Sequence, residues 1–339
     1  MRYFIKLSYD GAPFNGWQFQ PNAPTVQECL ENSLSTLLKS RVSVVGAGRT
    51  DSQVNAVGYI AHFDFDGPVP AVLSDAGGEL DTVKVGYKLN AILPRGIVVH
   101  EVHGIQGDLH ARFSASRREY TYFIHRTKDP FIESHSYFCP WDLDVDAMNE
   151  AARYLLGAHD FRCFEKIGSD NKTSDCVVFE ARWVFYEPSH VALMGYSATP
   201  GSPADSGRYL YFRIAADRFL RNMVRAVVGS LLEVGRGRRS VEDFASLVLP
   251  CTGSASGASD IPGGSAGSSA VPSFGPAGSA SDLSAACGSS AVPAGSASDG
   301  ACVSSARHRV RTAPDGTPFR SLAGESVPGH ALFLSKVEY

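Results

Sequence analysis

The amino-acid sequence predicts an α+β protein made of two related halves around a central antiparallel sheet. Three observations lead to this prediction. Short segments of alternating apolar residues recur along the chain, helical segments with an apolar stripe lie between them, and the first hundred residues show the order β-α-β-β-α-β. A similar series follows and is interrupted by a segment of biased composition. We therefore expect one half over 1–105, a second half over 106–250 plus 330–339, and an insertion over 251–329.

The first half begins with a strand over 3–9, in which apolar and polar residues alternate. A helix is predicted over 26–38, because Thr25 and Glu28 form a T-x-x-E capping box ahead of an apolar stripe. The remaining elements predicted for this half are strands at 41–46, 58–65 and 97–103 and a helix at 82–92.

The second half begins with an alternating strand over 118–125. A helix is predicted over 142–157, with Asp144 near its N-cap and Gly157 at its end. The remaining elements predicted here are paired strands at 176–186 and 208–215, a helix at 217–234 closed by Gly235, and a final strand within 330–339.

The insertion has a composition unlike the rest of the chain. Of residues 251–300, 39 of 50 are Ser, Ala, Gly or Pro, and the sequence GSSAVP occurs at both 267–272 and 288–293. Such a segment buries too little apolar surface to offset the entropy lost on ordering, so we expect disorder that extends to about Gly329. Three of the acidic residues that contribute to the net charge of −4 lie in this segment, so the rest of the chain is close to neutral.

Composition excludes several classes of protein. Hydrophobic residues make up 44% of the 339 residues, enough for a sizeable core, yet no apolar run is long enough to span a membrane. The N-terminus lacks the apolar region of a signal peptide. The seven cysteines are scattered and form no CxxC pair, so neither a zinc ribbon nor a disulfide framework is supported. We expect reduced thiols and a cytoplasmic location.

The segment GAGRTDSQVNA at 46–56 is the first candidate for chemistry. It places Arg49 and Asp51 in a loop between two apolar strands, where Gly46 and Gly48 permit tight backbone geometry. One interpretation is a turn with a solvated ion pair. The other, of equal weight on spacing alone, is a carboxylate kept ionised by neighbouring cations and able to serve as nucleophile or base in glycosidic-bond chemistry.

Two further segments combine arginines with apolar residues. HARFSASRREYTYF at 110–123 interleaves arginines with tyrosines, which suits either phosphate binding with base stacking or a sheet with core tyrosines and a basic edge. DRFLRNMVRAVVGSLLEVGRGRR at 217–239 carries arginines beside a core stripe, an arrangement that is usually a solvated helix face. Arg225 differs because it borders the apolar stripe, where a partly buried arginine needs a carboxylate partner.

Together these segments resemble the TruA family of tRNA pseudouridine synthases. YDGAPFNGWQFQPNAPTVQECLE at 9–31 is similar to the family's first strand, loop and helix, and GAGRTDSQVNA to its GRTDAGVHA-type motif. HARFSASRREYTY, FLRNMVRAVVGSLLEVGRG and ALFLSKVEY resemble later family segments in the same order. The resemblance extends over 1–249 and 330–339. It implies a pseudouridine synthase fold and isomerisation of uridine to pseudouridine at positions 38–40 of the tRNA anticodon arm, by a homodimer that needs neither cofactor nor metal.

The resemblance also implies roles for individual residues. Asp51 matches the catalytic aspartate, which acts either as a nucleophile at the sugar or as a base at C2′. Tyr120 matches the tyrosine that stacks on uracil and assists proton removal at C5, and Arg225 matches the basic residue that pairs with the aspartate. Arg49 matches the arginine that holds the target nucleotide out of the stack. The other arginines implied in binding RNA backbone phosphates are Arg112, Arg118, Arg218 and Arg221.

The chain departs from the family motif at three positions of the Asp51 loop. Ser52, Gln53 and Asn55 stand where the motif has Ala, Gly and His, and a glycine suits a special backbone angle. The leading hypothesis is an isomerase. A non-catalytic RNA-binding protein on the same scaffold is the second, with the altered loop as its support, and a hydrolase of N-glycosidic bonds is the third.

Overall fold

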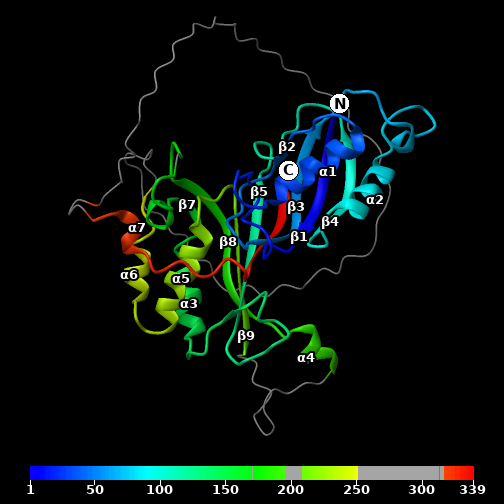
Figure 1. Cartoon of the computed structure of the whole chain (residues 1–339). Helices are drawn as coiled ribbons and strands as arrows, with labels where there is room; N and C mark the ends of the chain where they lie inside the picture. The colour runs from blue at the N-terminus through cyan, green and yellow to red at the C-terminus, as the bar shows by residue number, and fades with distance from the viewer. Residues whose placement is uncertain (170, 195–207, 251–312, 314–316) are drawn as a thin grey trace, which may run out of the picture. The chain divides into compact units, whose positions relative to one another are not determined.

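The computed structural model describes residues 1–169, 171–194, 208–250, 313 and 317–339. These residues form a sheet of ten strands and two groups of helices (Figure 1). The strand order along the main path is β4-β1-β3-β10-β5-β9-β8-β7, with β2 paired to β3 and β6 paired to β5. The disorder expected for 251–312 and 314–316 lies outside the described residues.

The first half supplies one edge of the sheet. Its central strand β1 (Arg2–Tyr9) pairs antiparallel with β3 (Asn55–Asp64) on one side and β4 (Ile97–Ile105) on the other. The remaining elements of this half are β2 (Val44–Gly46), α1 (Val26–Leu38), the 3-10 helix η1 (Ala71–Leu73) and α2 (Thr82–Ile92). Thr25 caps α1 by accepting a hydrogen bond from the Glu28 backbone N–H at 3.3 Å, as predicted.

The second half supplies the other edge. Its elements are β5 (Arg117–His125), β6 (Tyr137–Phe138), α3 (Val145–Arg153), β7 (Gly157–Asp160), η2 (Arg162–Phe164), β8 (Asp175–Phe185), α4 (Ser189–Met194), β9 (Tyr209–Ala216), α5 (Met223–Gly235), α6 (Val241–Ala245), α7 (Phe319–Leu322) and β10 (Leu332–Glu338). Helix α5 begins six residues later than the predicted start at 217, because Asn222 adopts a left-handed φ of 65°. Helix α3 ends at Arg153 rather than at 157, and Gly157 instead opens β7.

Strand β10 closes the sheet at its centre. It pairs antiparallel with β5 and, through Phe333↔Asn55 and Leu334↔Ala56, parallel with β3. The sheet is thus antiparallel except at this junction and at the short β5–β6 pair. The two halves therefore share one continuous sheet, joined by a strand that comes last in the sequence.

Helices α1 and α5, one from each half, pack against the same face of the sheet. Tyr9, Ala56, Leu334, Tyr120 and Ile214 lie opposite one another on successive strands, so their side chains point to one side. All five are buried, and they share a single hydrophobic core with the apolar residues of α1 and α5. The loop that follows β2 and the start of α5 consequently meet above the middle strands.

Residues 317–329 are packed, although we predicted them to belong to the disordered insertion. Ala323 and Val327 are buried, and the Gly324 N–H donates to the hydroxyl of Ser230 on α5 at 2.8 Å. A Cβ on Gly229 would lie 1.8 Å from the Glu325 carbonyl oxygen, so glycine permits this close approach. A few small and apolar residues within a polar stretch are enough to fix it, because α5 allows close approach at Gly229 and supplies hydrogen-bonding partners.

Candidate active site

The loop that carries Asp51 is held from below by the N-terminal strand and its following loop. The buried hydroxyl of Thr50 lies 2.9 Å from the Tyr9 hydroxyl, and the Trp17 N–H donates to the Thr50 carbonyl at 3.3 Å. Gly16, with a φ of 86°, lies so close that a Cβ would be 2.3 Å from the same carbonyl oxygen. The Asp51 side chain remains 28% exposed, so its backbone is fixed while its carboxylate faces an accessible space.

Arg225 brings a positive charge to Asp51 from the other half. Its Nη1 lies 3.4 Å from Asp51 Oδ2, and both side chains are about a quarter exposed. Its Nε donates to the Val327 carbonyl at 2.6 Å, while its own carbonyl accepts from the Val327 N–H at 3.2 Å. The ion pair predicted between Arg225 and Asp51 is therefore present, and Val327 orients the guanidinium from behind.

Tyr120 lies on β5, close enough to Asp51 for the carboxylate to affect its pKa. It is 8% exposed and packs edge-to-face on Phe219, with ring centroids 5.1 Å apart. Burial raises the pKa of Tyr120 to about 12, the Arg118 guanidinium lowers it in part, and the Asp51 carboxylate raises it. At neutral pH Tyr120 is thus an uncharged phenol beside an acidic group, able to stack on a flat ring and to donate a hydrogen bond.

Arg49 and Arg112 meet at one pocket beside the Asp51 loop. Both side chains are exposed, and the pocket has a volume of about 150 Å³. Its lining consists of Trp17, Gln18, Gln27, Val44, Val45, Gly46, Gly48, Arg49 and Arg112. The Arg112 backbone is set by His110, whose Nδ1 accepts from the Arg112 and Phe113 N–H groups at 3.1 and 3.2 Å. The pocket thus joins two cations to apolar and amide side chains.

Arg118 is used differently from the other arginines. Its Nε and Nη2 donate to the Ala47 carbonyl at 3.2 and 3.0 Å, and Nη1 donates to the carbonyls of Ala115 and Asp217 at 3.3 and 2.6 Å. Nη2 also donates to the Arg112 carbonyl at 2.5 Å. A guanidinium has five N–H groups, and all five are occupied. Arg118 therefore ties three loops together.

Arg218 and Arg221 lie between β9 and α5. Arg221 is exposed and Arg218 is half-buried. Within the ranges that the structure describes, neither guanidinium makes an ion pair or a hydrogen bond, and the same holds for Arg49 and Arg112. These four cations are thus available to an anionic ligand, whereas the Arg118 guanidinium is already saturated.

Two features of the site escaped the sequence analysis. Residues 327–330 contact Arg225 and the Asp51 loop, although the sequence predicts that 327–329 belong to the insertion. Asn55, which stands at the place of the motif's His, is buried and hydrogen-bonded at both ends of its amide. The periodicity of the sequence does not reveal such contacts, because they join residues separated by as many as 275 positions.

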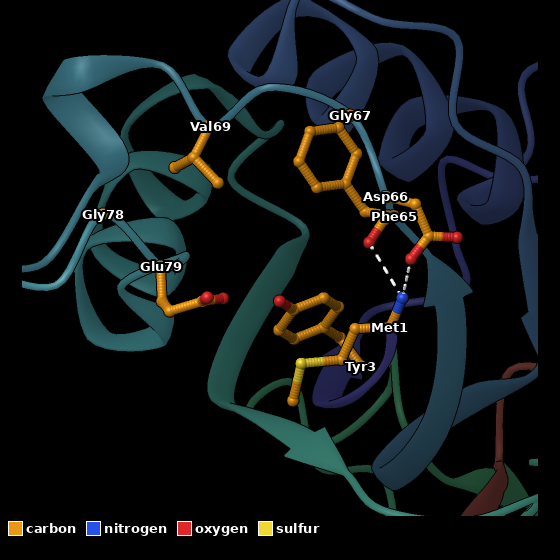
Figure 2. A pocket seen from close by; sticks show the side chains of 8 residues that line it. All are labelled: Met1, Tyr3, Phe65, Asp66, Gly67, Val69, Gly78 and Glu79. Carbon is orange, nitrogen blue, oxygen red and sulfur yellow. Dashed lines mark hydrogen bonds and ion pairs between the residues drawn. The ribbon is translucent and has the colours of Figure 1, made fainter.

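A second pocket, of about 340 Å³, lies elsewhere (Figure 2). The Met1 ammonium donates to the Phe65 carbonyl at 3.1 Å and contacts the Asp66 carboxylate. The lining residues are Met1, Tyr3, Phe65, Asp66, Gly67, Val69, Gly78 and Glu79. This pocket adjoins the end of β1 where Arg2 pairs with Asp64, while the Asp51 loop adjoins the end where Tyr9 pairs with Ala56. It is therefore separate from the candidate site.

The described part of the chain shows neither a cluster of metal-ligating residues nor a helix that could span a membrane. Its His, Cys, Asp and Glu residues form no group of three or more that is arranged to hold a metal ion. None of the helices described is long and apolar enough to cross a membrane.

Comparison with known proteins gives a consistent result. A family model described as tRNA pseudouridine synthase matches residues 151–259. Proteins named tRNA pseudouridine synthase A are similar over most of their length. The one from Bacteroides thetaiotaomicron is 44% identical over 247 residues, covering 73% of this chain and 81% of that protein. The one from Bacteroides fragilis is 43% identical, covering 73% and 86%. The one from Bacillus licheniformis is 38% identical, covering 74% and 90%. A solved structure titled "Crystal Structure of a Cbf5-Nop10-Gar1 Complex" aligns at 12% identity with a TM-score of 0.25, covering 68% of this chain and 54% of that one.

Proposed function

The chain belongs to the tRNA pseudouridine synthase A family, and on this premise we propose that it isomerises uridine to pseudouridine in tRNA. The observation that carries the proposal is the meeting of Asp51, Arg225 and Tyr120 above the middle strands of the sheet. A carboxylate, a cation that holds it and a flat phenol are the groups that the reaction requires in one place.

The reaction conserves all atoms of the nucleotide. The C1′–N1 bond of uridine breaks, the uracil turns, a C1′–C5 bond forms, the C5 proton leaves and N1 gains a proton. We propose that Asp51 starts this sequence, either by adding to C1′ or by taking the C2′ proton. Arg225 holds the carboxylate in place, and Tyr120 stacks on the uracil and assists proton removal from C5.

We propose the anticodon arm, at positions 38–40, as the part of tRNA that is bound. A base in a stem reaches the Asp51 carboxylate only when its nucleotide turns out of the stack, and Arg49 lies at the pocket next to that loop. Arg112, Arg218 and Arg221 are suited to backbone phosphates because their guanidinium groups are unoccupied in the described chain. Binding that rests on phosphates weakens as the salt concentration rises.

We propose further that the protein is a cytoplasmic homodimer made of two related halves, 1–105 and 106–250 plus 317–339, the second extended by the packed stretch 317–329. The supporting observation for the halves is that each packs a long helix, α1 or α5, into the core that covers one face of the sheet. Light scattering coupled to size-exclusion chromatography tests the dimer directly, since a single species of about 36 kDa would contradict it.

The assay that tests the function uses unmodified tRNA transcripts and purified protein. Pseudouridine is mapped by carbodiimide modification and primer extension, and we expect product at positions 38–40. Asp51→Asn is expected to abolish product while tRNA binding persists, whereas Asp66→Asn, in the pocket of Figure 2, serves as the matched control with normal activity.

The alternatives give different results in the same assay. Bound tRNA without any pseudouridine would indicate a non-catalytic RNA-binding protein, and release of free uracil would indicate a hydrolase. Full activity in Asp51→Asn would exclude the proposed mechanism.

A further inference from the structure

Asn55 is a buried amide at the first position of β3, four residues after Asp51. It is 1% exposed. Its Oδ1 accepts from the Gly11 N–H at 2.7 Å, and its Nδ2 donates to the His330 carbonyl at 2.6 Å. The side chain therefore joins the loop after β1 to the segment that leads into β10, with both ends of its amide in use.

That segment, residues 327–330, contacts both partners of the ion pair. Val327 exchanges hydrogen bonds with Arg225 of α5, and the hydroxyl of Tyr122 on β5 donates to the Pro328 carbonyl at 3.1 Å. On the Asp51 side, Gly329 lies so close that a Cβ would be 2.5 Å from the Ser52 carbonyl oxygen. The segment is therefore the short physical connection between the Arg225 guanidinium and the Asp51 loop.

We infer that Asn55 is a positioning residue, which fixes residues 327–330 against the Asp51 loop and thereby sets Asp51 opposite Arg225. The inference rests on the proposed function. The separation of 3.4 Å between the two charged groups is longer than an optimal charge-assisted hydrogen bond, so the ion pair needs support from neighbouring groups to keep its alignment. Their alignment depends on the neutral contacts behind them, and the Asn55–His330 bond fastens the segment to the start of β3.

The geometry demands one donor and one acceptor on the same side chain. An amide supplies both at every pH of interest. A neutral imidazole also supplies one of each, so a histidine at this position is able to replace the amide. Alanine supplies neither and leaves the His330 carbonyl and the Gly11 N–H without this partner.

The experiment compares single-turnover rates of pseudouridine formation, with tRNA affinity measured separately. We expect Asn55→Ala to lower the rate about 100-fold, the loss typical of a displacement of about 1 Å, while tRNA affinity changes less than about threefold. Asn55→His is expected to restore most of the rate. The matched control is Asn149→Ala, because Asn149 joins α3 to β8 with the same pattern of bonds, to the Trp183 carbonyl and N–H at 3.3 and 2.8 Å, away from Asp51.

A second variant tests the same connection from the other side. Gly329→Ala pushes the segment away from Ser52, so we expect a similar loss of rate. Because both substitutions disturb the same connection, the fold-loss of rate in the double variant should be much smaller than the product of the two single fold-losses. Rates are measured below the onset of thermal unfolding of each variant, so that lost folding is not counted as lost positioning.

The outcomes separate this inference from the proposed function. If the unaltered protein forms no pseudouridine, the proposed function fails. If it is active and folded Asn55→Ala is within about twofold of Asn149→Ala, the inference is wrong although the function stands. Effects of Asn55→Ala and Gly329→Ala that multiply fully, or that fall on tRNA affinity alone, would also overturn it.

Discussion

The guanidinium of Arg225 lies 3.4 Å from the carboxylate of Asp51, although the two residues are 174 positions apart in the sequence. Because Arg225 also donates to the Val327 carbonyl, its planar group is fixed at two points. Arg225→Lys retains the charge but cannot satisfy both partners in the same geometry. We expect the single-turnover rate to fall about 10- to 100-fold with little change in tRNA affinity.

Arg239 offers the control for this substitution. It also joins α5 to the segment before β10, with its Nε 3.0 Å from Glu233 Oε2 and its Nη2 donating to the Leu322 carbonyl at 3.0 Å, but it does not contact Asp51. Arg239→Lys should therefore affect the melting temperature more than the rate. Equal rates in Arg225→Lys and the unaltered protein would show that the pairing is dispensable.

We expect Arg118 to contribute to stability and Arg112 to contribute to tRNA binding. Because the Arg118 guanidinium donates to four different backbone carbonyls, Arg118→Lys should lower the free energy of unfolding by about 2–3 kcal/mol. Arg112→Ala should leave that free energy nearly unchanged, weaken tRNA binding, and reduce the slope of log affinity against log salt by about 1. Urea unfolding and salt titrations of tRNA binding check the two expectations, and the reverse assignment would contradict them.

Gln53 carries backbone strain that a glycine would remove. Its φ of 66° is in the left-handed region, where a residue with a Cβ is disfavoured by about 1–2 kcal/mol. Since glycine also loses more backbone entropy on folding, we expect Gln53→Gly to raise the free energy of unfolding by about 0.5–1 kcal/mol. The neighbouring substitution Ser52→Gly is the control, because Ser52 has no positive φ and should only lose stability. A lower stability in Gln53→Gly would contradict the strain argument.

His62 should make the free energy of unfolding depend on pH. It is 3% exposed, its Nδ1 accepts from the Ala111 N–H at 3.1 Å, and burial, the Arg2 charge and His110 lower its pKa to about 4, against a smaller opposing effect of Asp64. The unfolded chain takes up this proton near pH 6.5, so it binds more protons than the folded chain between about 6.5 and 4. The free energy of unfolding should therefore fall as the pH drops through this window, by up to about 3 kcal/mol.

Urea unfolding at several pH values measures this effect. His62→Gln should show a flatter dependence, because the titrating group is gone. An unchanged slope in His62→Gln would assign the acid sensitivity to other groups.

Local features of the chain were predictable because local physics determines them. The caps at Thr25 and Asp144 and the strands around β1, β5 and β9 lie where sequence pattern places them. The late start of α5 was not predictable, since the left-handed angle at Asn222 is stabilised by its amide donating to Ser326 at 2.6 Å, a partner far away in sequence. The same reason explains why the packed role of 317–329 was missed. The composition of that stretch is polar, and its order comes from α5 rather than from itself.

The site shows the same division. The meeting of Asp51 and Arg225 was expected from a partly buried arginine that needs a carboxylate and from the family resemblance. The saturation of Arg118 was not, because a charged residue in a basic segment gives no sign of whether its donors face solvent or backbone carbonyls.

The central position of β10 has a consequence for how the protein is made. During synthesis every other strand of the sheet leaves the ribosome before Leu332–Glu338, so β3 and β5 have no partner between them until then. Each half has its own helices and is able to collapse early, but the nascent chain cannot bring Asp51 and Arg225 together. The alignment of Asp51 with Arg225 therefore waits until this strand has been synthesised, and a chain cut short before it would lack the strand that joins β3 to β5.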